Sequence, residues 1–208
     1  MEKFVLAITR TCGSGGTTIG EMLAKEYGIK LYDRQLLSLA SEDSGISEAM
    51  FAGADESVRN TVLYKVSRKV YNGELIPPES GNFTSDNNLF NYQAKILKEM
   101  AKNESYVVIG RAADFILKED PNMISIFLHT GMEASVRHMK ETMDLTEKQA
   151  EKYIKKMDRY RSQYYKYHTG KRWRCPDQYD LCLDTEKIGY ENCVRMIREY
   201  ISLRIKES

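Results

Sequence analysis

The chain has 208 residues, of which 31 are lysine or arginine and 30 are aspartate or glutamate. This length suits one domain with a real hydrophobic core, and the near-neutral charge gives no general reason to expect nucleic-acid or membrane binding. No apolar run is long enough to span a bilayer, and residues 1–10 lack a signal-peptide pattern. None of the four cysteines forms a C-x-x-C pair, so we expect no zinc site or disulfide framework and a cytoplasmic location. We expect Cys182 and Cys193, which lie in apolar strand and helix patterns, to be in the core.

The stretch FVLAITRTCGSGGTTIG at residues 4–20 is the most informative part of the chain. An apolar, β-rich run over 4–8 predicts a strand, and a glycine-rich turn follows it. From Thr17 to about Tyr27 the apolar residues recur on one helical face. In the order strand, glycine turn, helix, backbone N–H groups and the positive end of the helix dipole can converge on a phosphate.

The strict phosphate-loop pattern is G-x-x-x-x-G-K-[ST]. With Gly15 as its second glycine, Arg10 stands at the first glycine, Gly16 at the lysine and Thr17 at the hydroxyl. Two of four fixed positions match, and a plain glycine turn between a strand and a helix is the alternative. If the loop binds ATP, we expect Thr17 to contact Mg²⁺ and the phosphates to be held by Gly13, Ser14, Gly15, Gly16, Thr17 and Thr18.

Four more short apolar runs predict strands, at 29–33, 106–109, 123–128 and 179–183. Helical patterns separate them, among them a helix from a capping box at Thr146 and Gln149 to about Tyr165, and a C-terminal helix from Gly189. Strands that alternate with helices predict an α/β fold with a five-stranded parallel, doubly wound sheet.

Residues 42–90 differ in character from the rest. Valines at four-residue spacing predict a helix over 56–71, and Pro77-Pro78 opens a long polar loop. A long loop inside a compact domain is usually mobile or functional. We interpret 42–90 as an inserted subdomain over the mouth of the sheet, within a single domain.

Asp33 and Arg111 each follow a predicted strand, so both should lie at the carboxyl edge of the sheet, where α/β folds bind ligands. Asp33 can also cap the next helix, and the two roles do not exclude each other. Arg111 can grip a phosphate or carboxylate with its planar fork, or form an ion pair with Asp114.

Residues 155–174 hold eight basic residues against Asp158 alone, with five interleaved aromatic residues. A solvent-exposed helix followed by a basic loop is the simplest interpretation, and a nucleic-acid-binding groove is a second. A third fits a phosphate loop better: a mobile segment, 158–175, that closes over phosphates.

Together these stretches resemble the cytidylate kinase-like family of P-loop nucleoside monophosphate kinases. The likeness is carried by TRTCGSGGTTIG at 9–20, LYDRQLL at 31–37, VIGRAADFIL at 108–117, DRYRSQYYKYHTG at 158–170 and the W…YDLCLDT pattern at 173–185. It departs from standard cytidylate kinases at Ile109, where their D-G-R pattern has aspartate, and at Gly16.

The resemblance implies a P-loop kinase-like three-layer fold with a helical insert and a lid over 158–175. It implies transfer of a phosphoryl group from Mg-ATP to CMP or dCMP, with small-molecule nucleotides rather than nucleic acid or membrane as partners. It places Asp33, Arg111 and Asp114 at the acceptor, and Asp158 and Arg161 in the lid. The candidate catalytic residues are Asp158, Arg161 and Arg10, the last of which can replace the missing lysine. A kinase of another small acceptor and a nucleotide-binding regulator with little turnover stay open.

Overall fold

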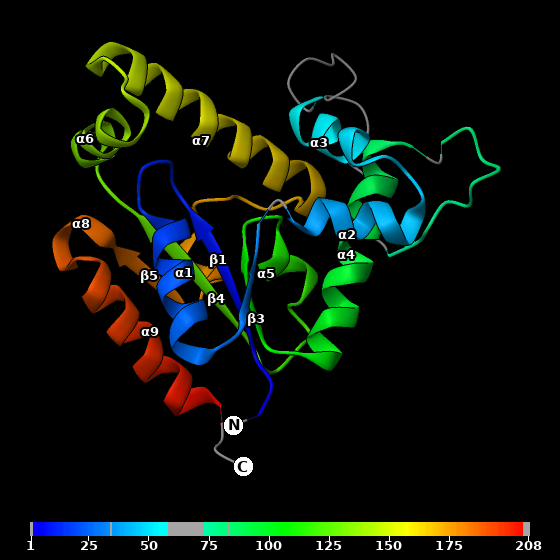
Figure 1. The fold of residues 1–208 in the computed structure, drawn as a ribbon, viewed down its shortest axis with the longest axis horizontal. Coiled ribbons are helices and arrows are strands. Elements are labelled where there is room, and N and C mark those ends of the chain that lie inside the picture. The colour runs from blue at the N-terminus through cyan, green and yellow to red at the C-terminus, as the bar shows by residue number, and fades with distance from the viewer. Residues whose placement is uncertain (1, 34, 58–72, 83, 206–208) are drawn as a thin grey trace.

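A five-stranded parallel sheet forms the centre of the molecule in the computed structural model, which describes residues 2–33, 35–57, 73–82 and 84–205 (Figure 1). The strand order is β2-β3-β1-β4-β5. The strands are β1 (Val5–Arg10), β2 (Lys30–Tyr32), β3 (Tyr106–Ile109), β4 (Met123–His129) and β5 (Leu181–Asp184). The predicted doubly wound parallel sheet is therefore confirmed.

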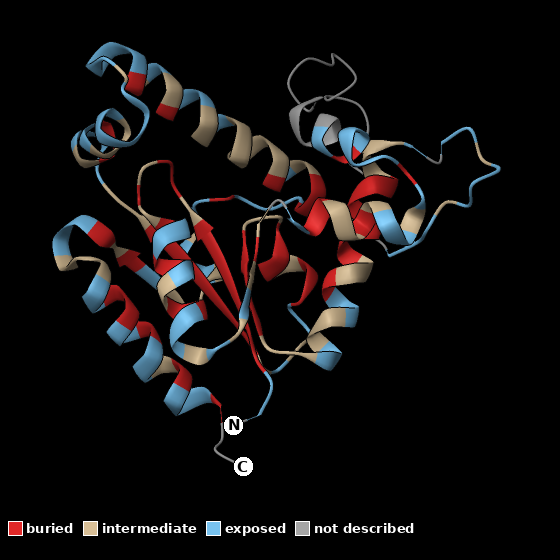
Figure 2. Ribbon diagram, in the orientation of Figure 1, coloured by how far each residue is buried: buried red, intermediate tan, exposed pale blue. Residues whose placement is uncertain are grey.

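The three middle strands lie deepest, as their unbroken apolar sequences predict. β1 pairs with β3 from Val5 opposite Tyr106, and with β4 from Val5 opposite Met123. Figure 2 shows these strands buried almost throughout. Ile109, at the end of β3, packs against Gly20 of the first helix, so the residue in place of the aspartate of the D-G-R pattern is a core residue.

Helices cover both faces of the sheet, which gives the predicted three layers (Figure 1). On one face α1 (Gly16–Tyr27) and α9 (Tyr190–Arg204) pack through Leu23 and Ile197 onto Leu6 and Ile8. The other face packs against three helices: α4 (Asp86–Asn103), α5 (Ala113–Ile116) and α7 (Glu147–Thr169). Alternate residues of each strand face opposite layers, because side chains alternate along a strand.

The remaining helices are α2 (Gln35–Ser44), α3 (Glu48–Ser57), α6 (Met132–Met143) and α8 (Thr185–Ile188). Part of the predicted insert packs as a small unit of its own, because Phe51 of α3 shares a buried cluster with Leu37 of α2 and Leu89 of α4. Most of the helix expected over 56–71 lies outside the described residues.

Helix α7 differs most from its prediction. Both halves of the capping box at Thr146 and Gln149 are present, as expected, but the helix continues to Thr169 rather than ending near Tyr165.

The placement of Cys182 in the core was wrong: it lies on the edge strand β5 and is exposed, whereas Cys193 is buried. Within the described residues, no helix is both long enough and apolar enough to cross a membrane.

Candidate active site

The turn between β1 and α1 is held in shape by two glycines. Gly13 and Gly15 adopt φ values of +80° and +70°, which side-chain-bearing residues rarely adopt. Both also touch a neighbour: a Cβ on Gly13 would lie 2.8 Å from the Cα of Ser135, and one on Gly15 would collide with the ring of Tyr190. We call residues 11–16 the phosphate loop. Because these two positions lack side chains, Ser135 and Tyr190 can pack directly against the loop.

Arg10 fills the place where a lysine at position 16 would begin. A Cβ on Gly16 would lie 2.6 Å from the Cβ and 2.7 Å from the Cγ of Arg10. Such distances are far shorter than a normal carbon–carbon contact of about 3.5–4.0 Å. Arginine at the first motif position and glycine at the lysine position are therefore sterically matched.

The guanidinium of Arg10 lies among charged groups from three segments of the chain. Its Nη2 atom lies 3.8 Å from Oδ2 of Asp33, and its Nη1 atom lies against Gly110. Arg161 reaches in from α7 and donates a hydrogen bond of 3.2 Å from Nη1 to the carbonyl oxygen of Arg10. Burial, and then the charge of Arg161, lowers the pKa of Arg10 to about 9, while Asp33 opposes the change. Arg10 therefore stays protonated at neutral pH.

Arg111 follows β3 in an unusual backbone turn. Gly110, Arg111 and Ala112 have successive φ values of +74°, +60° and +52°. A left-handed conformation costs a non-glycine residue free energy, and such residues concentrate at functional sites. The pKa of Arg10 is lowered chiefly by burial and by Arg161, and the charge of Arg111 adds a smaller contribution in the same direction. We refer to Arg10, Arg111 and Arg161 as the arginine cluster.

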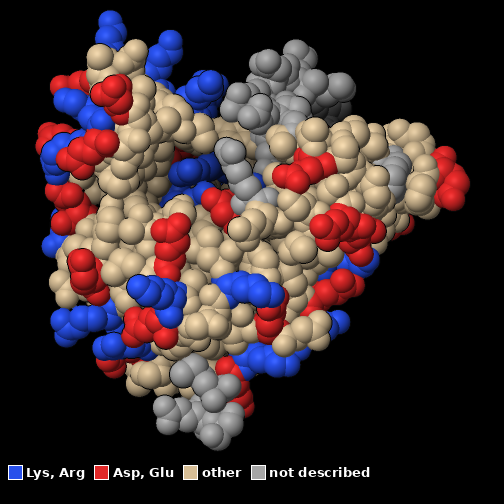
Figure 3. Space-filling view, viewed as in Figure 1, with Lys and Arg blue, Asp and Glu red and all other residues tan. Residues whose placement is uncertain are grey.

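Basic side chains gather in a hollow beneath α7, on the side of the molecule where the phosphate loop lies (Figure 3). Like charges repel, and the three arginines lie together with the carboxylates of Asp33 and Asp158, so an anionic ligand would reduce the repulsion among the arginines. Predicted residues from four segments are thus brought together: Arg10, Asp33, Arg111 and Arg161.

Asp158 lies at the junction of α7 and the phosphate loop. Its Oδ1 atom accepts a hydrogen bond of 2.7 Å from the backbone N–H of Cys12, and its Oδ2 atom accepts one of 2.6 Å from Arg174. Arg161 Nη1 lies 3.9 Å from the same carboxylate. Asp158, the single acidic residue of the basic run, therefore has Arg174 as a hydrogen-bonded partner and Arg161 close by.

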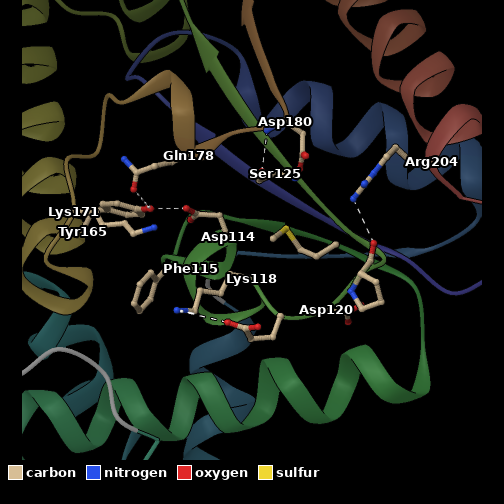
Figure 4. Close-up of a pocket in the computed structure, with 13 residues that line it drawn as sticks. Asp114, Phe115, Lys118, Asp120, Ser125, Tyr165, Lys171, Gln178, Asp180 and Arg204 are labelled. Carbon is tan, nitrogen blue, oxygen red and sulfur yellow. Dashed lines mark hydrogen bonds and ion pairs between the residues drawn. The ribbon is translucent and has the colours of Figure 1, made fainter.

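Asp114 occupies a different place from the other predicted residues. Its Oδ2 atom accepts a hydrogen bond of 2.6 Å from the hydroxyl of Tyr165, and its carboxylate lines a pocket that includes Lys171 and Gln178 (Figure 4). None of the residues lining that pocket belongs to the phosphate loop or the arginine cluster.

The aromatic residues of the basic segment are packing groups. Tyr165 and Trp173 are buried, and Trp173 meets Phe127 edge to face with 5.8 Å between ring centroids. His168 stacks on Phe90 at 4.0 Å, and burial lowers its pKa to about 3, so its ring is neutral. These rings are turned toward the core rather than set out as a platform for bases.

The position of Thr17 is compatible with binding Mg²⁺. Its side chain is exposed in the first turn of α1, directly after the phosphate loop. No group of three or more His, Cys, Asp or Glu able to hold a metal occurs among the described residues. In P-loop enzymes a serine or threonine hydroxyl at this position is one of the protein ligands of Mg²⁺, so Thr17 offers the expected kind of donor.

Two contacts of the site could not be read from the sequence. Tyr190, against Gly15, follows β5 at the start of α9, and no motif marks it. Arg174 was visible only as one basic residue of a run, because its pairing with Asp158 depends on the turn after α7. The signal for this pairing was Asp158, the single acidic residue within that basic run.

Comparisons with known proteins identify the family to which the chain belongs. A sequence model of the cytidylate kinase-like family matches residues 5–187. A cytidylate kinase from Thermosipho melanesiensis is 30% identical over 153 residues, which cover 67% of this chain and 70% of that protein. An uncharacterized protein from Eubacterium ventriosum has a crystal structure that superposes with a TM-score of 0.72 at 26% identity, over 97% of this chain and all of the other.

More distant structures share the fold alone. A shikimate kinase from Bacteroides thetaiotaomicron superposes with a TM-score of 0.53 at 13% identity, over 95% of this chain and 98% of that one. A gluconokinase from Sinorhizobium meliloti gives 0.51 at 13% identity, over 97% and 94%. The fold is that of P-loop kinases, and the chain belongs to the cytidylate kinase-like family.

Proposed function

We propose that this protein transfers the γ-phosphoryl group of Mg-ATP to a nucleoside monophosphate, with CMP or dCMP as the acceptor. The observation that carries the proposal is the packing of Arg10 on Gly16, because the Cβ and Cγ of Arg10 occupy the place where the usual lysine side chain would begin, and its guanidinium continues toward Asp33 and Gly110. Family membership supports the reaction class, and the name of the Thermosipho melanesiensis relative supports the acceptor.

The phosphate loop holds the donor in this proposal. Backbone N–H groups of Gly13–Thr18, at the amino end of α1, bind the β-phosphate. Thr17 would hold Mg²⁺, which would neutralise part of the charge on the donor phosphates. Arg10 and Arg161 supply positive charge beside the transferring group. Because phosphoryl transfer needs position and charge more than a strong base, these groups are sufficient for the chemistry.

Asp33 and Arg111 bind the acceptor. Arg111 meets the acceptor phosphate with its planar fork, and Asp33 accepts from a hydroxyl or amino group while holding Arg10 in place. We leave Asp114 out of the acceptor site, since its carboxylate lines another pocket. We assign Asp158 a positioning role, because its oxygens already accept from Cys12 and Arg174.

Two larger segments complete the proposal. The insert at 42–90 closes the acceptor side, and the segment 158–175 acts as a lid that carries Arg161 to the donor phosphates. The cytoplasm suits the protein, because all four cysteines are free and a reducing compartment keeps them so.

The test is a coupled assay of ADP release with Mg-ATP and a panel of CMP, dCMP, UMP, AMP, shikimate and gluconate. The proposal expects CMP or dCMP to give the highest kcat/KM, and the Gly15→Val variant to be inactive yet folded. Turnover only with a non-nucleotide would make this a P-loop kinase of another small acceptor. ATP binding without turnover on any acceptor would make it a nucleotide-binding regulator.

A further inference from the structure

A pocket of about 370 Å³ lies between α5, the first residues of β4 and the segment that follows α7 (Figure 4). Tyr165 and Gln178 form one wall, and Phe115 and Met123 contribute apolar surface. The pocket shares no lining residue with the proposed kinase site. It is large enough for a small metabolite, and the proposed reaction does not use it.

Asp114 lies in this pocket with one oxygen bonded and the other not. Only 5% of the residue is exposed. Oδ2 accepts from Tyr165, whereas Oδ1 is buried and makes no hydrogen bond of normal geometry with the described residues. Burial raises the pKa of Asp114 to about 6, although Tyr165, the backbone N–H groups of residues 114 and 115 and Lys171 favour the charged form. Above pH 7 the carboxylate is therefore ionised and short of a donor.

Neighbouring polar groups already have partners. Gln178 donates from Nε2 to the carbonyl oxygen of Arg172 at 2.5 Å, and Asp180 accepts from the backbone N–H and the hydroxyl of Ser125. A buried acceptor without a donor costs about 1–3 kcal/mol, more when it is charged. Oδ1 of Asp114 is thus the place where a ligand would gain most.

Two lysines stand on either side of Phe115. The Nζ atoms of Lys118 and Lys171 lie 5.0 Å and 5.7 Å from the centre of its ring. Lys118 also lies 3.8 Å from Glu119, whereas Lys171 makes no ion pair with any described residue. Positive charge at this wall therefore remains available to an anion.

We infer that this pocket binds a short zwitterion, its ammonium group at Asp114 and its carboxylate or phosphate at Lys171 and Lys118. An ammonium group donates a hydrogen bond to Oδ1 and also neutralises the buried charge. A hydroxyl group can donate a hydrogen bond but cannot neutralise the charge. A simple anion would pair with the two lysines but would leave the buried carboxylate of Asp114 without a donor or a counter-charge. A simple cation would leave Lys171 without a partner.

Calorimetric titration with matched probes tests the inference on the full chain at pH 8. L-alanine is the carboxylate zwitterion and phosphoethanolamine the phosphate zwitterion, which distinguishes the two anionic groups. L-lactate replaces the ammonium with a hydroxyl, and ethylamine removes the carboxylate. At least one zwitterion should bind with a millimolar or lower Kd, and lactate and ethylamine at least tenfold more weakly. Binding should persist with saturating ATP, because the two sites share no residue.

Two variants and a control locate the binding. Asp114→Asn keeps the shape of the side chain and an acceptor for Tyr165 but loses the charge, and Lys171→Met removes the other charge. Each should weaken zwitterion binding at least tenfold, whereas Lys166→Met, at an exposed position of α7 outside the pocket, should bind as the wild type does. The inference is overturned if neither zwitterion binds, if lactate binds as well as alanine, or if both pocket variants bind normally.

Discussion

The carboxylate of Asp158 and the backbone N–H of Cys12 are joined by a hydrogen bond of 2.7 Å across 146 residues of sequence. This bond fastens the middle of α7 to the phosphate loop. Because the second oxygen of Asp158 holds Arg174, the same side chain also fixes the turn that follows the helix. The position of the loop thus depends on a residue that need not touch the substrate.

Asp158→Asn should weaken ATP binding about tenfold or more. The amide cannot accept from both Cys12 and Arg174 as a carboxylate does, and a hydrogen bond to a charged group contributes about 1.5–3 kcal/mol. Calorimetric titration with ATP measures the change. Glu151→Gln is the control, since Glu151 pairs with Lys155 farther from the loop on the same helix. Equal ATP affinity in the two variants would show that the bond between Asp158 and Cys12 does not shape the loop.

The steric match between Arg10 and Gly16 predicts a non-additive pair of substitutions. Gly16→Lys alone should be inactive, since its Cβ would collide with the stem of Arg10. Arg10→Gly alone should lower kcat by about 10³ or more, as expected for a lost cation at a transferring phosphoryl group. The double variant restores the standard phosphate-loop pattern and should turn over faster than either single variant.

Turnover of all four forms, measured by ADP release, completes a double-mutant cycle. Thermal unfolding of each variant separates lost chemistry from lost folding. If the two losses simply add in the double variant, Arg10 does not stand in for the lysine, and another group provides the charge.

The sequence predicted those parts of the fold that depend on local pattern. Runs such as Tyr106–Ile109 are apolar and β-branched, and only a buried strand suits them, so the sheet was predictable. The end of α7 was not, because continued packing of Tyr165 and His168 against the core extends the helix past the last clear periodic signal. Cys182 looked like a core residue because an edge strand and a central strand share the same alternation.

The site was predictable as a set of residues but not as a set of partners. Arg10, Asp33, Arg111 and Arg161 were chosen because they lie at strand ends or in a basic run, and strand ends meet at one edge of a parallel sheet. Asp114 was grouped with them at the acceptor, and an ion pair with Arg111 was the alternative. A short helix, α5, turns its side chain toward Tyr165 instead, and a four-residue helix leaves too little pattern to show that direction.

Arg111→Lys should raise the KM for the acceptor tenfold or more and leave ATP affinity unchanged. Lysine keeps the charge but loses the planar fork, and it must also hold the left-handed backbone at φ +60°. Steady-state kinetics over a range of CMP, with separate ATP titration, give the two quantities. A drop in melting temperature without a change in the KM for CMP would assign Arg111 to structure rather than to the acceptor.

Closure of the segment 158–175 should be visible in the fluorescence of Trp173, the single tryptophan of the chain. Trp173 is buried beside Phe127, and Arg174 lies over its ring at 5.4 Å. Phosphates compete with Asp158 for Arg174, so ATP and CMP together should shift the emission more than either alone. High salt should reduce the shift, because it screens these charges. A spectrum unchanged by every nucleotide combination would mean that the segment is fixed.

Asp114 should make the stability of the protein fall as pH rises from about 4 to about 6. Its folded pKa of about 6 lies above the ordinary value near 4, so the folded state binds the proton more tightly than the unfolded chain does. The contribution of protonated Asp114 to the free energy of unfolding is therefore fully present below pH 4 and is lost above pH 6. His168 acts in the opposite direction, because burial lowers its pKa to about 3 and the unfolded chain takes up the proton first.

Comparison with Asp114→Asn isolates the contribution of the carboxyl group, since His168 is present in both proteins. Asparagine does not titrate, so the variant should gain about 2 kcal/mol in unfolding free energy relative to the wild type between pH 4.5 and pH 7.5. Urea unfolding at the two pH values measures this difference. The Lys166→Met variant should show the wild-type pH dependence, because Lys166 is exposed. A constant difference between wild type and Asp114→Asn would mean that the carboxyl group of Asp114 does not titrate in this range, and that Lys171 and the backbone N–H groups of residues 114 and 115 compensate its burial completely.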